Sequence, residues 1–201
     1  EEESQVLQEI LRENHRAVAI VQGLRSLFTD KSPPQARLDL GDFVTHWVAR
    51  QAPVLAQQFG VRLGVRAQAA VHVQASAVQL EMVLQNLVNN AVEAMACGQG
   101  DAIEVILLAH GHQALIDVVD DGPGLAPELH EKVFEMSFST KTQGMGLGLW
   151  LSRRIAQTHR GDLVCIAQHP GFVLLAAKQQ QPDQGAAEHQ QAQQHKGAPE
   201  K

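Results

Sequence analysis

Three separated segments carry asparagine, acidic and glycine residues at spacings that suit a metal and a phosphate-bearing ligand. In NLVNNAVEAM, Asn86 and Asn90 lie four residues apart and Glu93 follows, so a helix here would place all three on one face. Amide oxygens are hard neutral ligands that suit Mg²⁺ when phosphates share its coordination. Taken alone, the segment also fits an ordinary solvated helix face.

The second segment, VVDDGPGL, places a carboxylate beside bare backbone. Asp120 ends an apolar run, and Gly122 and Gly124 follow it at alternate positions. A carboxylate in such a place can accept a hydrogen bond from the amino group of a flat ligand, and adenine has such a group. An ordinary Asp-Gly turn is the alternative.

The third segment, STKTQGMGLGLW, has Gly144, Gly146 and Gly148 at alternate positions after Lys141. Because glycine destabilises a helix interior by about 1 kcal/mol relative to alanine, this run predicts that something approaches the main chain closely. Main-chain N–H groups, the positive end of the following helix and Lys141 together favour phosphates as that neighbour. The spacing matches neither the dinucleotide-binding fingerprint nor the P-loop.

Hydrophobic periodicity predicts the elements that must position these segments. Helices are expected at residues 1–28, 41–59, 76–95 and 147–158, and strands at 37–40, 61–66, 71–74, 102–109, 114–120, 162–167 and 172–177. This order predicts an α+β fold in which helices pack against one mixed sheet. Ser76, with Gln79 three residues on, is the expected N-cap of its helix. Pro53 is expected to make its helix irregular, and His159 is expected to be a cation at a helix C-terminus.

Length and composition exclude several classes of protein. The 201 residues allow one domain with a sizeable core plus appendages. A net charge of -6, with 16 basic residues scattered among 22 acidic ones, excludes a nucleic-acid partner. The two cysteines show neither metal-ligand spacing nor a disulfide framework, which indicates a reduced, cytoplasmic protein. No apolar run reaches the roughly 20 residues that span a bilayer, so no membrane contact is expected of this sequence, although upstream segments could anchor a longer protein.

The two ends of the sequence differ in character from its middle. An apolar stripe predicts one long N-terminal helix, which must pack against a partner helix or a second chain. The residues of this stripe are Val6, Ile10, Ala17, Val21, Leu24 and Phe28. Residues 178–201 are nearly devoid of large apolar side chains and are expected to be disordered.

Taken in this order, the segments resemble the N, G1, F and G2 boxes of bacterial sensor histidine kinases, within the superfamily that includes gyrase, MutL and heat-shock chaperone ATPases. VLQNLVNNAVEAM resembles the N box, DDGPG the G1 box, VFEMSFSTK the F box and GMGLGLWLSRRI the G2 box. The short lid between Lys141 and Gly144 resembles the nitrogen-regulation and oxygen-sensing branch. The resemblance implies a Bergerat-type α/β sandwich over residues 36–177, with a mixed sheet packed on one face by helices.

The resemblance also implies a role for each site residue, with ATP and Mg²⁺ as cofactors. Asp120 would recognise the adenine amino group, Asn90 would hold Mg²⁺, and Lys141 with the backbone of residues 144–148 would hold the phosphates. Asn86 is expected to assist catalysis beside Asn90 and Lys141. The remaining expected contacts to the nucleotide are Glu93, Gly122, Gly124, Thr140, Gly144, Gly146, Leu147 and Gly148.

One position bears on the chemistry that the resemblance implies. ATP-hydrolysing members and related serine kinases carry a glutamate base four residues before the metal asparagine, where this sequence has Asn86. An amide cannot take a proton from water or from a serine hydroxyl, which favours transfer to a histidine, whose neutral imidazole already exposes a lone pair. Catalysis would then depend on positioning the γ-phosphoryl and neutralising its charge.

The acceptor histidine is expected upstream of this sequence. His15 is followed by Arg16 and Ala17, and no proline appears before Pro33, so it does not match the family's acceptor motif. Residues 1–32 resemble instead the second helix of the dimerisation hairpin, which implies a homodimer. The implied downstream partner is a response-regulator receiver domain. Two alternatives stay open: a non-catalytic dimerisation or interaction module with the kinase fold, and a serine/threonine kinase of the same fold.

Overall fold

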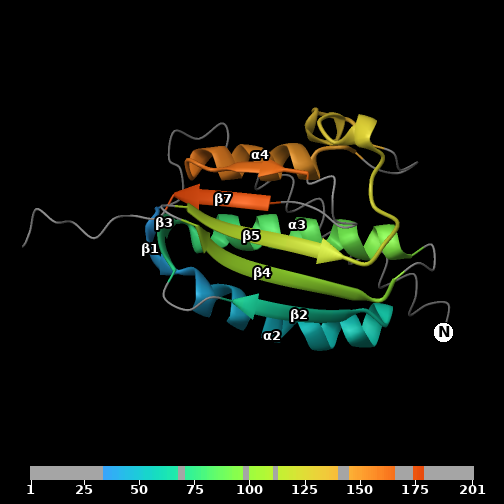
Figure 1. Cartoon of the computed structure of the whole chain (residues 1–201), viewed down its shortest axis with the longest axis horizontal. Coiled ribbons are helices and arrows are strands. Elements are labelled where there is room, and N and C mark those ends of the chain that lie inside the picture. Colours follow the sequence, from blue (N-terminus) through green and yellow to red (C-terminus); the bar gives the residue numbers. More distant parts are fainter. Residues whose placement is uncertain are drawn as a thin grey trace, which may run out of the picture.

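A five-stranded mixed sheet forms the centre of the fold, and Figure 1 shows it face-on. Its strand order is β2 (Arg62–Ala67), β4 (Ala102–His110), β5 (Gln113–Asp120), β7 (Leu174–Lys178) and β6 (Asp162–Val164). β2 pairs with β4 in parallel, and the other three pairs are antiparallel. The computed structural model describes residues 34–67, 71–96, 100–110, 113–139, 145–165 and 174–178.

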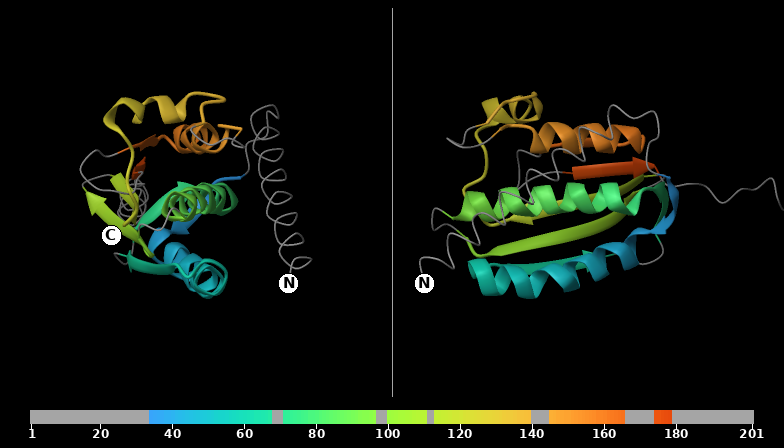
Figure 2. Two further views of the ribbon diagram at one scale, coloured as in Figure 1. Left: turned by 90° about the vertical axis from the view of Figure 1, so that its right-hand side faces the viewer. Right: turned by 180° about the vertical axis from the view of Figure 1, so that it is seen from behind.

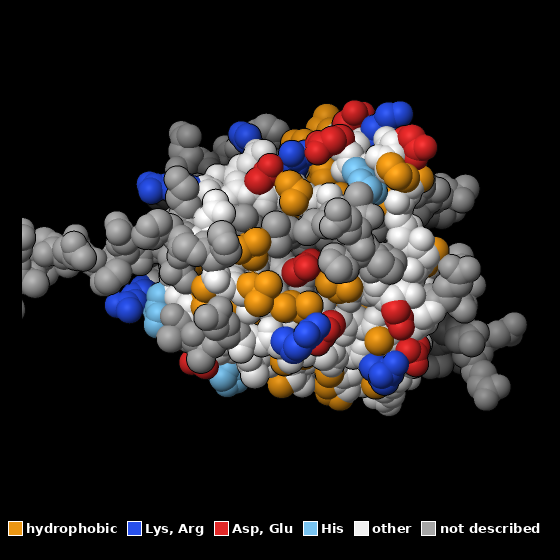
Figure 3. All heavy atoms as spheres, viewed as in Figure 1, with side chains coloured by type: hydrophobic (Ala, Val, Ile, Leu, Met, Phe, Trp, Pro, Cys, Tyr) orange, Lys and Arg blue, Asp and Glu red, His pale blue; other side chains and the backbone are white. Residues whose placement is uncertain are grey.

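The two central strands alternate between a buried and a solvent-facing row. On the buried side, Ile103, Val105 and Leu107 of β4 lie opposite Asp120, Val118 and Ile116 of β5. The other side is mixed: Figure 3 shows apolar side chains among single charged ones on this face. The register therefore places Asp120 at the end of a buried apolar row.

Three helices cover the buried face of the sheet, as Figures 1 and 2 show: α2 (Leu40–Phe59), α3 (Ala77–Met95) and α4 (Gly148–Thr158). Strands β1 (Ala36–Asp39) and β3 (His72–Ala75) form a separate antiparallel pair, so the expectation of one sheet for all strands was wrong. Two short 3₁₀ turns, η1 (Pro127–Leu129) and η2 (Lys132–Phe134), lie between β5 and α4. The expected mixed sheet packed on one face by helices is confirmed.

Helix α2 is capped at both ends. The Asp39 carboxylate accepts hydrogen bonds from the backbone N–H groups of Gly41 (2.8 Å) and Asp42 (3.2 Å). Gly60 ends the helix with a positive φ of 68°. Pro53, where an irregularity was expected, lies inside the helix and does not end it.

Helix α3 supplies the largest share of the helical core. Its buried residues are Gln79, Leu80, Val83, Leu84, Leu87, Val88, Ala91, Val92 and Met95. Burying one such aliphatic side chain stabilises the fold by about 1.5–3 kcal/mol. Since this face is almost entirely apolar, the polar residues Asn86, Asn90 and Glu93 remain on the other side of the helix.

The start of α3 is not capped as the sequence predicted. Ser76 occupies the N-cap position, but its side chain makes no capping hydrogen bond and Gln79 is buried in the core. The backbone N–H of Ser76 instead donates to Nε2 of His159 at 3.0 Å. A histidine from the end of α4 therefore satisfies this buried donor.

His159 is a neutral buried side chain, which corrects the expectation of a cation. It is 4% exposed, and its Nδ1 lies 2.9 Å from the Ile155 carbonyl oxygen while Nε2 accepts from Ser76. Because Nε2 must keep its lone pair to accept, the proton lies on Nδ1 and is donated to that carbonyl. The C-terminal end of α4 is thus joined to the N-terminal end of α3.

Several sequence expectations lie outside the described residues. These are the long N-terminal helix within residues 1–32 and the tail from residue 179 onward. Among the residues that the structure describes, no helix is both long and apolar enough to cross a membrane.

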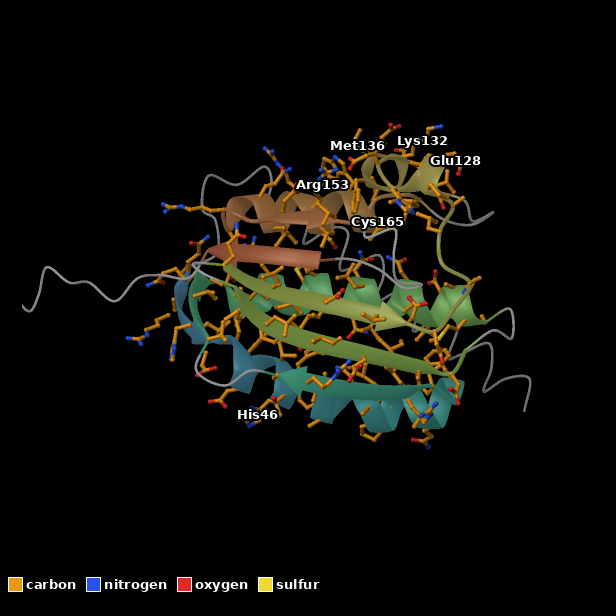
Figure 4. The ribbon with its side chains drawn as sticks, viewed as in Figure 1. His46, Glu128, Lys132, Met136, Arg153 and Cys165 are labelled. Carbon is orange, nitrogen blue, oxygen red and sulfur yellow. The ribbon has the colours of Figure 1, made fainter. Side chains whose placement is uncertain are left out.

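Replacing His159 by alanine should lower the free energy of unfolding by about 2 kcal/mol, because the buried Ser76 N–H would lose its acceptor and a cavity would remain. Urea unfolding followed by circular dichroism measures this. His46→Ala is the matched control, since His46 lies exposed on α2 (Figure 4) and should cost less than about 0.5 kcal/mol. Equal losses in the two variants would contradict the proposed role of His159.

Candidate functional site

The carboxylate of Asp120 lies at the C-terminal end of β5 with only 6% of the residue exposed. Its Oδ1 accepts a hydrogen bond from the backbone N–H of Gly122 at 2.9 Å. Burial raises the pKa of this carboxyl, the Gly122 hydrogen bond opposes the rise, and the neighbouring charge of Asp121 adds to it. A buried acceptor of this kind favours a ligand that brings a hydrogen-bond donor.

Gly122 is glycine because the protein's own atoms surround it. A Cβ at this position would lie 2.7 Å from Oδ1 of Asp120 and 3.2 Å from Cγ of Met95 on α3. Gly124, two residues on, has a positive φ of 71°, which an L side chain rarely adopts. The loop therefore holds a tight turn against the C-terminal end of α3.

Asp121 fixes this loop to the start of β4. Its side chain accepts from the backbone N–H of Ala102 (3.0 Å), and its own N–H donates to the Ala102 carbonyl (3.2 Å). Gly100, with a φ of 87°, lies against Asp121 so closely that a Cβ there would overlap the carboxylate. These contacts set the direction in which the Asp120 carboxylate is presented.

The middle of α3 meets the start of α4 through Asn86. Its Nδ2 donates to Oγ of Ser152 at 2.9 Å, and Ser152 is 2% exposed. A Cβ added to Gly148 would lie 3.2 Å from Nδ2 of Asn86 and closer still to its Oδ1. The Asn86 amide therefore occupies the space that a side chain at position 148 would need.

The turn before α4 is held by the segment that follows η2. Gly146 has a φ of 63°, and a Cβ there would overlap the backbone of Phe138 and Ser137. The Gly146 carbonyl accepts from the Ser137 N–H at 3.1 Å, and Ser137 itself has a positive φ of 68°. Leu147 is half-buried, and its carbonyl accepts the N–H of Leu151.

Asn90 and Glu93 lie one turn and two turns beyond Asn86 on the polar side of α3. Asn90 is half-buried and Glu93 is exposed. An amide oxygen with a nearby carboxylate fits Mg²⁺, which takes few protein ligands and completes its shell with phosphates and water. In the described part of the chain no cluster of three or more His, Cys, Asp or Glu residues could hold a metal by itself.

The loop after Asp120 and the turn before α4 both contact helix α3, at different points along its axis. Met95 contacts the loop after Asp120, and Asn86 contacts the start of α4. Nine residues separate them, which corresponds to about 13 Å along the helix, and Asn90 lies between. Of the other expected site residues, Thr140, Lys141 and Gly144 lie outside the described residues.

Arg153 joins α4 to the segment that carries η1 and η2, and the sequence reasoning missed it. Its guanidinium donates to Asp162 (3.0 and 3.2 Å) and to Glu131 (3.0 Å). It also lies over the ring of Phe134, 4.8 Å from the centroid. Figure 4 shows Arg153 between the two elements. An arginine on a helix gives no sequence signal of this role, because its partners come from other elements.

Comparison with known proteins identifies the family of this chain and the solved structures that share its fold. Residues 75–188 match the family described as Histidine kinase-, DNA gyrase B-, and HSP90-like ATPase. The C4-dicarboxylate transport sensor protein DctS of Rhodobacter capsulatus is 33% identical over 174 residues, which is 85% of this chain and 26% of DctS. The chain thus spans about a quarter of the length of that relative.

Two solved structures place the fold among histidine kinases. The nucleotide-free catalytic domain of histidine kinase ThkA superposes with a TM-score of 0.62 at 25% identity, covering 73% of this chain and 96% of that domain. A structure of ThkA in complex with the response regulator protein TrrA gives a TM-score of 0.66 at 20% identity, covering 85% of this chain and 49% of the kinase.

Replacing Asp120 by asparagine should stabilise the fold at pH 7, because it removes a buried charge while Asn can still accept from Gly122. The folded-state pKa of Asp120 lies above the unfolded value of about 3.9, so the charge begins to cost stability as the pH rises past that value. The advantage of the variant should therefore shrink as the pH falls toward 4. Urea midpoints between pH 4 and 7 measure it.

Asp101→Asn is the control of opposite sign, because Arg62 lowers the pKa of Asp101 and ionisation there favours the folded state. That variant should lose a little stability at pH 7. An Asp120→Asn protein less stable than the parent at pH 7 would contradict the description of Asp120 as a carboxylate held in its site at a cost.

Proposed function

Because the chain belongs to the family of histidine kinase-, DNA gyrase B- and HSP90-like ATPases, we propose that it is the ATP-binding catalytic part of a sensor histidine kinase. Its substrates in this proposal are ATP and a histidine side chain. The phosphorylated histidine then passes its phosphoryl group to an aspartate of a response regulator. The observation that carries the proposal is the buried Asp120 carboxylate, backed by Gly122 at the end of an apolar strand.

Asp120 selects the base in this proposal. Its carboxylate accepts the amino group of adenine, while Gly122 and Met95 leave a close-packed apolar edge beside it. A base without that amino group would leave a buried charge unpaired, which costs about 1–3 kcal/mol. Guanine bound in the same orientation would present its C6 carbonyl oxygen to the carboxylate, and two facing acceptors disfavour it relative to adenine.

The phosphates lie toward the start of α4 in this proposal. Backbone N–H groups at Gly146 and Gly148, the positive end of α4 and the Lys141 ammonium bind them. Asn90, with Glu93 nearby, would hold Mg²⁺, which neutralises charge on the transferring phosphoryl group when it is bound. The chain's own task is to hold the γ-phosphoryl in line with its acceptor.

A histidine acceptor suits the residue at position 86. The Asn86 amide cannot accept a proton from water or a serine hydroxyl, and its Nδ2 is already donated to Ser152. A neutral imidazole can attack the γ-phosphorus with its lone pair. The bond between that phosphorus and the β,γ-bridging oxygen breaks, and ADP leaves.

The acceptor histidine belongs to a helical hairpin of which residues 1–32 form the second helix in this proposal. His15 is not the acceptor, and two copies of the hairpin pair to form a homodimer. The receiver domain of a response regulator is the downstream partner, which is supported by the ThkA–TrrA complex of the same fold.

Asp120→Ala and Asn90→Ala should each weaken binding of a non-hydrolysable ATP analogue with Mg²⁺ by at least about tenfold, since the first removes the contact to the base and the second the proposed ligand of the metal. Isothermal titration with and without Mg²⁺ measures this, and Asn90→Ala should remove most of the metal dependence. Asn89→Ala is the control, because Asn89 is exposed and its side chain accepts a hydrogen bond from Gln85 on the same helix. Unchanged affinity in Asp120→Ala would refute the assignment of the adenine site.

Incubation with [γ-³²P]ATP and Mg²⁺ tests the acceptor. A protein extended upstream to include the whole hairpin should acquire an acid-labile, base-stable label, and the 201-residue chain alone should not. His15→Ala should leave the label on the extended protein unchanged. An acid-stable label would indicate a serine or threonine kinase, and an extended protein that binds ATP without labelling would indicate a non-catalytic module.

A further inference from the structure

We propose that Asn86 is a positioning residue that sets the start of α4, and that position 148 is glycine to make room for Asn86 rather than for phosphate. The proposal rests on the proposed function, since the turn before α4 is where the triphosphate would bind. It differs from the sequence expectation in assigning Gly148 to a contact within the protein.

The geometry of three residues carries the proposal. Gly148 and Ser152 are one helical turn apart and face α3 together. The Asn86 amide lies against both: Nδ2 donates to the buried Oγ of Ser152, and the amide carbon lies 3.1 Å from where a Cβ of residue 148 would be. One amide therefore fixes the rotation and the axial position of the first turn of α4.

Backbone conformation does not require glycine at position 148. The described glycines with positive φ are Gly60, Gly100, Gly124 and Gly146, and Gly148 is not among them. Alanine is also the better helix former, by about 1 kcal/mol in a helix interior. The contact with Asn86 is thus the reason in the structure for a bare position here.

A Cβ at position 148 would act by moving Asn86. The amide could swing away, but it would then give up its hydrogen bond to Ser152, whose hydroxyl is buried. The first turn of α4 and the backbone N–H groups at its start would lose their fixed relation to Asn90 on α3. Nucleotide affinity would fall although no nucleotide contact has been removed.

The same contact accounts for the residue type at position 86. Asparagine reaches Ser152 across the space left by Gly148, and its amide N–H donates to the buried hydroxyl.

A double-mutant cycle tests the proposal on the whole chain. Gly148→Ala alone should lower the urea midpoint and weaken binding of Mg²⁺ with a non-hydrolysable ATP analogue by about tenfold. In an Asn86→Ala background the same substitution should be neutral or stabilising, and affinity should stay within about threefold of Asn86→Ala alone. Loss or reversal of the Gly148→Ala effect in the Asn86→Ala background is a result that a purely local effect of either residue would not give.

The outcomes separate the explanations. If stability recovers in the double variant but its affinity falls about tenfold below that of Asn86→Ala alone, the glycine serves the phosphate and the proposal is overturned. Additive losses in stability would show that the two positions do not act through one contact, which also overturns it. Asn89→Ala, on the exposed side of the same helix, replaces Asn86→Ala in a parallel control cycle and should be additive.

Two further measurements cover a Gly148→Ala variant that does not fold and a parent chain that binds no nucleotide. If Gly148→Ala does not fold, Ser152→Ala combined with Asn86→Ala gives the same cycle, and non-additive effects on affinity support the proposal while additive effects overturn it. If the parent chain binds no nucleotide with Mg²⁺, the proposed function fails, and coupling in the unfolding data alone still decides whether Asn86 sets the start of α4.

Discussion

The double packing of α3, against the sheet on one side and against α4 on another, is the constraint on which the rest of the structure depends. Its apolar face closes the core over β5, with Leu80, Val83 and Leu84 almost fully buried. Its partner α4 is joined to it at two places, by Asn86 with Ser152 and by Ser76 with His159. The polar side of α3 is thereby held in place next to both loops of the site.

This arrangement explains why the site uses buried polar groups that cost stability. Asp120 remains a carboxylate at the edge of an apolar core, which raises its pKa and disfavours its charged form. Asp121 and Gly100 lock the loop that presents it. In the proposed function, a hydrogen bond from a ligand amino group would offset part of the cost of burying the Asp120 charge, which would favour ligands that carry such a group.

The sequence was sufficient for the elements but not for the contacts between them. Periodicity gave α3 and α4 to within about one residue, since apolar spacing along a helix is local information. The predicted cap of α3 and the predicted charge of His159 were wrong because Ser76 and His159 bond to each other across 83 residues of sequence, which local patterns do not show. The glycine pattern was recognised, yet its reason at position 148 was not, because the atom that excludes a side chain there belongs to Asn86. Resemblance to known motifs named the site residues, and only the fold could show what holds them.

The most direct test of the central claim is a titration of the ¹⁵N-labelled chain with Mg²⁺ and a non-hydrolysable ATP analogue, followed by amide chemical shifts. The account predicts that the backbone amides of Gly122, Asn90 and Gly148 shift together at one binding constant, while Leu108 on the opposite side of the sheet does not. Shifts confined to that opposite side, or separate binding constants for the loop at Gly122 and the start of α4, would contradict a single nucleotide site along α3.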